Sequence, residues 1–203
     1  MITPRRVVLA TGNAGKQREF QALLAPRQFE VVTQTQLGIE SVEETGSTFE
    51  ANALLKARHA ARVSGLPALA DDSGLEVDAL GGRPGVWSAR YAGPHATDAA
   101  NNARLLQELH DVPLPERTAR YRCVIVWVSG ADDPHPLIAN GSWEGAIGLT
   151  PKGEGGFGYD PLFIPTGNGA GGAGMTAAEM TPAAKNAVSH RGLALAELLR
   201  LLP

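Results

Sequence analysis

Short apolar runs alternate with helical patterns over the first third of the chain. Residues 7–10 are an apolar run typical of a buried strand, residues 29–32 predict a second strand, and between them apolar residues recur at helical spacing. Residues 48–65 have an alanine-rich apolar face, which predicts a second helix with Thr48 as its N-cap. The order strand, turn, helix, strand is typical of an α/β protein.

The middle and the end of the chain add more strands. A polar turn at residues 71–74 separates two predicted strands at 66–70 and 75–80. The other predicted elements are a helix at 97–109, an antiparallel pair at 119–128 and 137–144, and a last helix from 189 or 190 to 202. Residues 153–161 are too glycine-rich for a regular element, and residues 167–174 predict a surface loop. The strands that cluster in the middle favour a mixed sheet over an all-parallel one.

Composition limits the classes of function. With 203 residues, of which 43% are hydrophobic, the chain has the size of one large domain or of two closely joined lobes. A net charge of -3 argues against binding to a nucleic acid polymer. The single cysteine, Cys123, lies in an apolar stretch, which excludes an internal disulfide and a thiolate metal cluster and predicts a strand residue. No stretch has the length of a membrane span and no signal segment is evident, so we expect no membrane association and a cytoplasmic protein.

The segment Thr11-Gly12-Asn13-Ala14-Gly15-Lys16 joins the first predicted strand to the first predicted helix. Its glycines allow a close approach to the backbone, the helix start presents N–H groups, and Lys16 adds a charge, so the segment could bind phosphates. Its spacing matches neither the P-loop nor the dinucleotide-binding signature. An ordinary strand-to-helix turn is the alternative.

Acidic residues occur in two pairs. Asp71 and Asp72 follow a buried strand, which is where catalytic and metal-binding groups of α/β sheets lie. Because adjacent residues on a strand point to opposite sides, one of the two can enter a site while the other caps a turn or pairs with a lysine. Glu43 and Glu44 precede a helix and are either solvated surface or, with Asp72, oxygen ligands for Mg²⁺. Lys56 lies on the same side of the predicted helix as Asn52 and His59. This side is either a polar functional face or simply the solvent-exposed face of the helix.

Candidate base-binding residues lie in the second half. Phe157 has glycines on both sides and could stack on a planar base, or else fill a gap in the core. Lys185, His190 and Arg191 could donate hydrogen bonds to a carbonyl oxygen on a base edge, or else be surface residues. Each segment alone is a weak signal.

Taken in order, these segments closely resemble the inosine triphosphate pyrophosphatase family, the RdgB-like XTP/dITP diphosphatases. The matching segments are Thr11 to Lys16, Glu43-Glu44-Thr45-Gly46, Thr48 to Ala57, Ala70 to Leu75, Gly81 to Gly85, Ser88 to Tyr91, Gly156 to Pro161 and Ser189-His190-Arg191. The resemblance runs nearly end to end; only the loop at 167–174 is longer and more glycine-rich than the family leads us to expect.

The resemblance implies one domain over residues 1–203, in which an elongated mixed sheet lies between two lobes and a nucleotide cleft separates them. It also implies a homodimer that uses Mg²⁺ to hydrolyse (deoxy)inosine and xanthosine triphosphates to the monophosphate plus pyrophosphate. Such a reaction removes deaminated purines from the nucleotide pool.

Site residues follow from the resemblance together with the chemistry above. The phosphates would be bound by Thr11, Gly12, Asn13, Ala14, Gly15, Lys16 and Lys56. Glu43 and Asp72, with Glu44 as a further ligand, would bind Mg²⁺, and Asp72 would accept the proton of the attacking water, with Asp71 in reserve. An alternative is that the carboxylate only orients a water that the metal has already made acidic.

At the base, Phe157 would stack, Asp160 would accept from N1–H, and donors from Lys185, His190 or Arg191 would contact the oxygen at C6. Ser73, Gly158 and Tyr159 complete the expected substrate-binding set. No residue is identified that rejects the 2-amino group of guanine.

Three other functions fit part of the sequence. A Maf-type nucleotide pyrophosphatase would act on pyrimidine or modified nucleotides, but Phe157 and residues 189–191 argue against it. A non-catalytic purine sensor would gain nothing from bare carboxylates beside phosphates unless a metal bridged them. A dinucleotide-dependent oxidoreductase fits the first strand and turn, but residues 31–34 lack the acid that binds ribose.

Overall fold

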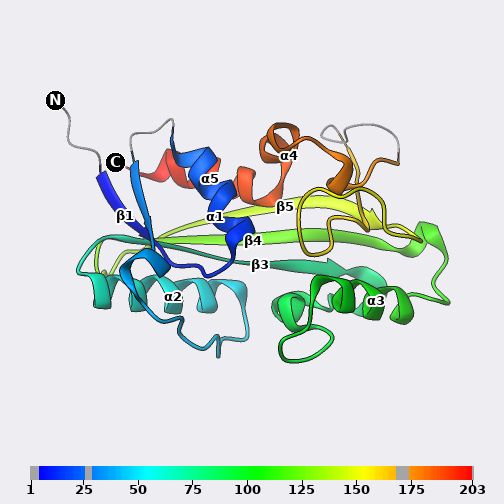
Figure 1. Ribbon diagram of the computed structural model, residues 1–203, viewed down its shortest axis with the longest axis horizontal. Helices are drawn as coiled ribbons and strands as arrows, with labels where there is room; N and C mark the ends of the chain where they lie inside the picture. Colours follow the sequence, from blue (N-terminus) through cyan, green and yellow to red (C-terminus); the bar gives the residue numbers. More distant parts are fainter. Residues whose placement is uncertain (1–4, 26–28, 168–173, 203) are drawn as a thin grey trace. The chain divides into compact units, whose positions relative to one another are not determined.

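A six-stranded sheet, with the strand order β2-β1-β3-β4-β5-β6, is the main element of the computed structural model, which describes residues 5–25, 29–167 and 174–202 (Figure 1). β1 pairs in parallel with β2 and with β3, in the registers Val7 to Val31 and Val8 to Ala68, whereas β5 and β6 pair antiparallel. The prediction of an α/β fold with a mixed sheet flanked by helices is confirmed.

The strands are β1 (Arg5–Leu9), β2 (Phe29–Thr33), β3 (Ala68–Val77), β4 (Thr118–Val128), β5 (Leu137–Ile147) and β6 (Phe163–Pro165). The α-helices are α1 (Ala14–Leu24), α2 (Phe49–Ser64), α3 (Asp98–Glu108), α4 (Pro182–Val188) and α5 (His190–Leu201). Thr48 and Thr97 cap α2 and α3, each accepting from a backbone N–H three residues on, as the threonine in front of each apolar pattern predicts.

Contacts divide the chain into two compact units. Unit 1 comprises residues 1–72, 123–140 and 194–203, and the alternation of its strand residues builds two cores. Val8 and Ala10 pack with the alanine face of α2, whereas Val7 and Leu9 pack with side chains of α1 and α5. Figure 1 shows α2 on one face of these strands and α1 and α5 on the other.

Unit 2 comprises residues 73–122 and 141–193 and has one core. Its members come from α3, from strands β3 to β6 and from the loops between them, and they include the aromatic side chains Tyr121, Trp143, Tyr159 and Phe163. The prediction of one domain with a nucleotide cleft between two lobes stays a prediction.

The predicted turn at residues 71–74 is wrong. β3 runs without a break through Asp71, Asp72, Ser73 and Gly74 to Val77, so the acids lie within a strand, and residues 78–80 form a short 3-10 helix instead of strand. Local sequence favours a turn here, but both carboxylates have partners from neighbouring elements, and these tertiary contacts override the local preference.

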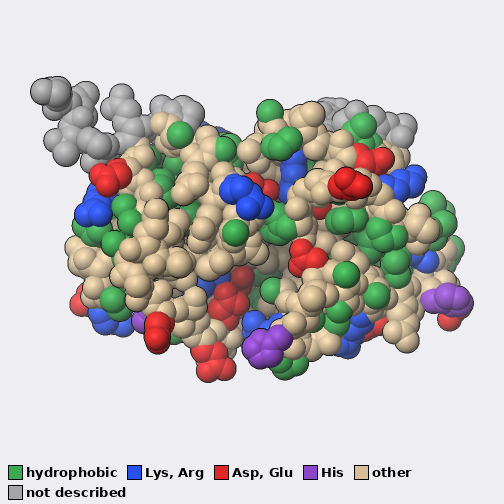
Figure 2. Space-filling model, in the orientation of Figure 1, with side chains coloured by type: hydrophobic (Ala, Val, Ile, Leu, Met, Phe, Trp, Pro, Cys, Tyr) green, Lys and Arg blue, Asp and Glu red, His purple; other side chains and the backbone are tan. Residues whose placement is uncertain are grey.

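Two elements near the C-terminal end were not predicted, α4 and the short strand β6. Most of the predicted loop at 167–174 lies outside the described residues. Among the described residues no helix is long and apolar enough to cross a membrane. On the face drawn in Figure 2, acidic and basic side chains are interspersed.

Candidate active site

The Thr11 to Lys16 segment is the start of α1, with Asn13 as the N-cap. The Asn13 side chain accepts the Lys16 N–H over 3.0 Å, and the Asn13 N–H donates to the Thr11 hydroxyl over 3.2 Å. Gly12, Asn13 and Ala14 are exposed, whereas Gly15 is buried. The first N–H groups of a helix have no partner within the helix, so this exposed turn suits an anion.

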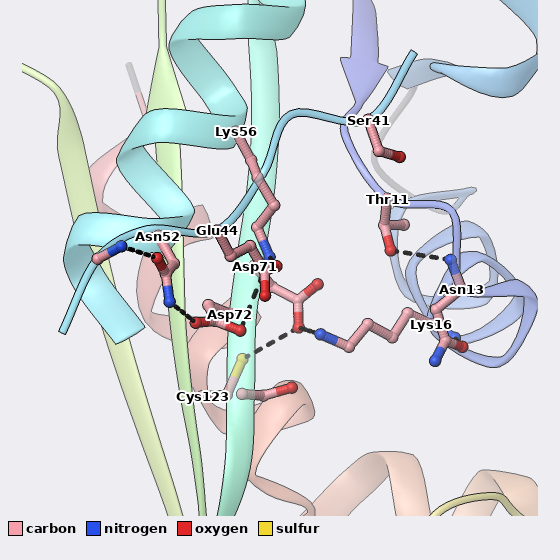
Figure 3. A network of polar contacts seen from close by, with 12 residues as sticks. Thr11, Asn13, Lys16, Ser41, Glu44, Asn52, Lys56, Asp71, Asp72 and Cys123 are labelled. Carbon is pink, nitrogen blue, oxygen red and sulfur yellow. Dashed lines mark hydrogen bonds and ion pairs between the residues drawn. The ribbon is translucent and has the colours of Figure 1, made fainter. Parts of the chain in front are cut away.

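Lys16 points at the first acid of the strand pair. Its Nζ lies 2.8 Å from Oδ2 of Asp71, whose side chain is fully buried, and the Cys123 Sγ lies 4.0 Å from the same oxygen (Figure 3). Cys123 lies on β4, as predicted for a strand residue. Asp71 therefore pairs closely with a lysine, which is one of the roles expected for this acidic pair.

Asp72 has different partners, because consecutive strand residues point to opposite sides. Its Oδ2 accepts from Asn52 Nδ2 over 3.0 Å, and its Oδ1 lies 3.7 Å from Lys56 Nζ (Figure 3). Lys56 also contacts Glu44 over 2.5 Å. We call Lys16, Glu44, Lys56, Asp71 and Asp72 the lysine–carboxylate cluster; all five lie in unit 1.

Asn52 is the functional side chain that the sequence did not assign to the site. It is fully buried on α2, where its Oδ1 accepts the Gly46 N–H over 2.8 Å while its amide donates to Asp72. It thereby fixes the acidic segment and the strand acid to the same helix. Its spacing of four residues from Lys56 was the available signal.

Burial and charge act against each other on the titrating groups of the cluster. Burial raises the pKa of Asp72 above its ordinary value, although Lys56 and Lys16 oppose the shift. Burial lowers the pKa of Lys56, but Asp72, Asp71 and Glu44 more than reverse this, so its pKa is raised. Lys56 therefore stays charged, and Asp72 is a better proton acceptor than an exposed aspartate.

The donor set suits a hard cation that also binds substrate phosphates. The described residues contain no group of three or more His, Cys, Asp or Glu side chains that could hold a metal alone. However, Mg²⁺ needs only one or two carboxylates when waters and phosphates complete its shell. The cluster has two lysines against three carboxylates, a formal charge of -1, so a triphosphate would need a further cation there.

The two glutamates of the predicted metal site differ in exposure. Glu44 is half-buried against Lys56, whereas Glu43 is exposed. The two side chains therefore do not share an environment.

The second group of predicted residues lies in unit 2, in the loop before β6. The Asp160 Oδ2 accepts the Phe157 N–H over 2.9 Å and the Lys185 Nζ over 2.7 Å. Gly156 has a φ of 74°, and a Cβ there would lie 2.0 Å from Asp160 Oδ2, so only glycine allows this close turn. Asp160 therefore shapes the loop that presents Phe157.

Cations surround the Phe157 ring, which is half-buried. The Lys185 Nζ lies 4.9 Å and the Arg191 guanidinium carbon 5.7 Å from the ring centroid. Arg191, fully buried, also donates to the Ser73 hydroxyl over 3.1 Å. His190 is buried with its ring stacked on Tyr121. We call Phe157, Asp160, Lys185, His190 and Arg191 the aromatic–cation cluster.

Tyr159 and Gly158, two further residues predicted to bind substrate, have different surroundings. The Tyr159 hydroxyl donates to the Ser88 carbonyl over 2.8 Å and its ring belongs to the core of unit 2. Gly158 is held through its backbone by α3, whose Asp98 accepts its N–H over 2.6 Å and whose Asn102 donates to its carbonyl over 2.9 Å. These contacts fix the loop directly after Phe157.

Comparison with known proteins gives the family. Residues 7–201 match the model of the Ham1 family, and the chain therefore belongs to it. Among curated proteins, the dITP/XTP pyrophosphatase of Shigella flexneri is 57% identical, over 98% of each chain. That of Methylococcus capsulatus is 58% identical over 96% of this chain and 94% of its own. A solved structure, a HAM1 protein from Coxiella burnetii, superposes with a TM-score of 0.86 at 47% identity and 97% coverage of both chains. The resemblance found in the sequence is confirmed.

Proposed function

We propose that this protein hydrolyses non-standard purine nucleoside triphosphates, dITP, ITP, XTP and dXTP, to the monophosphate and pyrophosphate, with Mg²⁺. The family and the names of its relatives support this activity. The single observation that carries the chemistry is the lysine–carboxylate cluster, in which a buried Asp72 is oriented by Asn52 and lies beside Lys56.

The phosphate-binding role is assigned to the start of α1 and to the two lysines. Thr11, Gly12, Asn13, Ala14 and Gly15 would offer N–H and hydroxyl donors, and Lys16 and Lys56 would offset charge on the phosphates. Positioning and charge stabilisation account for most of the catalysis of phosphoryl transfer, so these contacts would lower the barrier directly.

Asp72 is the proposed proton acceptor. It would take a proton from a water that attacks the α-phosphorus, and the bond from that phosphorus to the bridging oxygen would break to release pyrophosphate. Asp72 and a carboxylate of the acidic pair, Glu43 or Glu44, would bind Mg²⁺. When bound, this ion would neutralise phosphate charge as it develops in the transition state. Because Lys56 already compensates Glu44, the exposed Glu43 is the carboxylate that we assign to the metal.

The aromatic–cation cluster is the proposed binding site for the base. Phe157 would stack on the purine, and Lys185, His190 and Arg191 would donate to the oxygen at C6, where adenine has an amino group. A buried donor without a partner costs about 1 to 3 kcal/mol, which gives roughly tenfold to hundredfold discrimination per contact. Asp160 Oδ1 accepts from Tyr121 over 3.3 Å, and a carboxylate oxygen can accept from a second donor such as N1–H.

The test is pyrophosphate release from dITP, XTP, dGTP and dATP with and without Mg²⁺. We expect Mg²⁺-dependent turnover of the first two substrates and much slower turnover of dATP. Rates within a few-fold for all four would contradict the proposed selectivity. No release from dITP would favour a nucleotide sensor.

Asp72→Asn tests the catalytic assignment. We expect kcat for dITP to fall by about 10²- to 10⁴-fold while dITP still binds, since only the proton acceptor is lost. Asp71→Asn is the matched control, because it removes the neighbouring buried carboxylate that contacts Lys16. Near-normal turnover by the Asp72 variant, or an equal loss in kcat for both variants, would remove Asp72 from this role.

A separate comparison would identify the metal ligand. Glu43→Gln and Glu44→Gln are compared by the Mg²⁺ concentration that gives the half-maximal rate.

We further propose a homodimer, as the family resemblance implies, and we propose that the protein acts in the cytoplasm. Light scattering after size exclusion tests the first point, and cell fractionation the second. A mass of one chain at all concentrations, or recovery outside the cytoplasmic fraction, would contradict the respective statement.

A further inference from the structure

We propose that Tyr121 is a specificity-determining positioning residue, whose ring orients His190 and whose hydroxyl orients Asp160. The inference rests on the proposed function, which assigns these two side chains to the base. Neither the sequence nor the family resemblance gave Tyr121 a role. All three residues lie in unit 2.

The ring contact with His190 is close and parallel. The two ring centroids are 4.6 Å apart with an interplanar angle of 9°, and both residues are buried. Trp143 flanks both rings, with its centroid 6.3 Å from Tyr121 and 6.5 Å from His190 and its ring inclined to them by 20° and 18°. A ring held face to face in a dense core cannot turn freely about its last torsion, so Tyr121 fixes the direction of the imidazole nitrogens.

The hydroxyl contact acts on the other oxygen of Asp160. Tyr121 donates to Oδ1 over 3.3 Å, whereas Lys185 and the Phe157 N–H both contact Oδ2. The carboxylate is thus held at both oxygens and its plane is set. Burial and the charge of Asp160 raise the pKa of Tyr121 well above its ordinary value, so the phenol keeps the proton that it donates.

Packing alone does not explain a tyrosine here. A buried hydroxyl costs free energy unless it is hydrogen-bonded, so a position needed only for its volume favours phenylalanine. The neighbouring Phe163 fills such a position. It is fully buried, and its ring lies 4.7 Å from Tyr121 and 5.1 Å from Trp143.

Phe163 therefore offers a matched control. Tyr121→Leu and Phe163→Leu each remove one buried ring from the same core, but only the first removes the stack on His190. Tyr121→Phe keeps the stack and removes only the hydroxyl. If Tyr121→Leu fails to fold, Tyr121→Met and Phe163→Met replace the two leucine variants in the same comparison, because the flexible methionine side chain adapts better to a gap in a core.

The experiment measures kcat and KM for dITP and dATP, together with the melting temperature. For Tyr121→Leu we expect the KM for dITP to rise about tenfold with kcat within about twofold, and the preference for dITP over dATP to fall about tenfold. Phe163→Leu should lose comparable thermal stability and keep both KM and preference within about twofold. Tyr121→Phe should raise the KM for dITP by about two- to fivefold.

Equal changes in the two leucine variants, or an unchanged KM and preference in Tyr121→Leu, would overturn the proposal. A Tyr121→Phe enzyme identical to the unmodified enzyme would overturn the part that concerns the hydroxyl. The unmodified enzyme is assayed first: failure to hydrolyse dITP would contradict the proposed function, whereas failure of the variants to differ contradicts only the role of Tyr121.

Discussion

Replacing Asn52 by leucine removes two hydrogen bonds at once from a fully buried position. The asparagine donates to Asp72 over 3.0 Å and accepts from the Gly46 N–H over 2.8 Å. Leucine has a similar size and is a good helix former, so α2 should persist. The change leaves a buried carboxylate oxygen and a backbone N–H without these partners.

The expected loss of stability follows from the two bonds. A hydrogen bond to a charged group contributes about 1.5 to 3 kcal/mol and an ordinary one about 1 kcal/mol, which together give about 3 kcal/mol. For a chain of 203 residues, this lowers the melting temperature by about 6 to 12 °C. Because Asp72 also loses the group that orients it, we expect kcat/KM for dITP to fall by a further factor of about 10 to 100.

Asn101→Leu is the control for this prediction. Asn101 is also buried on a helix and also makes two hydrogen bonds, to Ala92 over 2.8 Å and to Ala89 over 3.2 Å. We expect a similar loss of melting temperature without the additional loss of activity. Assays well below both melting temperatures separate the two effects. Full activity in Asn52→Leu, or an equal loss in both variants, would refute the orienting role of Asn52.

Two further predictions concern stability. In Gly192→Ala, the new Cβ would lie 1.9 Å from the Asn186 carbonyl oxygen, so we expect the free energy of unfolding, measured by chemical denaturation, to fall by about 3 kcal/mol. Gly130 has open space around it, so Gly130→Ala should leave the free energy of unfolding nearly unchanged. Equal stability of the two variants would contradict the close approach at Gly192. Hydrogen bonds from Arg120 and Thr118 lower the pKa of Asp78 below its ordinary value of 3.8. The charged Asp78 side chain therefore stabilises the folded protein above that pH, by less than about 1 kcal/mol at this exposed site. This stabilisation is lost as the pH falls through the lowered pKa. The difference in unfolding free energy between the unmodified protein and Asp78→Asn should therefore shrink between pH 5 and about pH 2, and a difference that grows on acidification would contradict the sign.

Local patterns predicted the elements whose causes are local. The helix at 48–65 was correct because an N-capping threonine, an alanine-rich face and a terminal glycine all act within the segment itself. The apolar strands of the sheet were also correct, because alternation alone assigns their two faces.

Features that depend on distant partners could not be predicted in this way. β3 continues through Asp71 and Asp72 because Lys16, Lys56 and Asn52, all far away in the sequence, meet the two carboxylates. Residue types alone indicated one site for these side chains, but the individual pairs depend on how α1, α2 and β3 pack.

The same holds for the base-binding residues. Asp160 was predicted only as a direct contact to the purine, whereas its carboxylate also accepts the backbone N–H of Phe157 and so shapes the loop. The stack of His190 on Tyr121 joins residues 69 positions apart, and no local pattern indicates it.

The unbroken course of β3 has a consequence for how this protein can change. Because side chains alternate along a strand, Asp71 and Asp72 keep their separate lysine partners only while the number of residues before them is fixed. Inserting or deleting a single residue upstream in β3 would exchange the two sides and present the wrong carboxylate to each lysine. Evolution and engineering can therefore vary the identity of the neighbouring residues in this strand far more easily than its length.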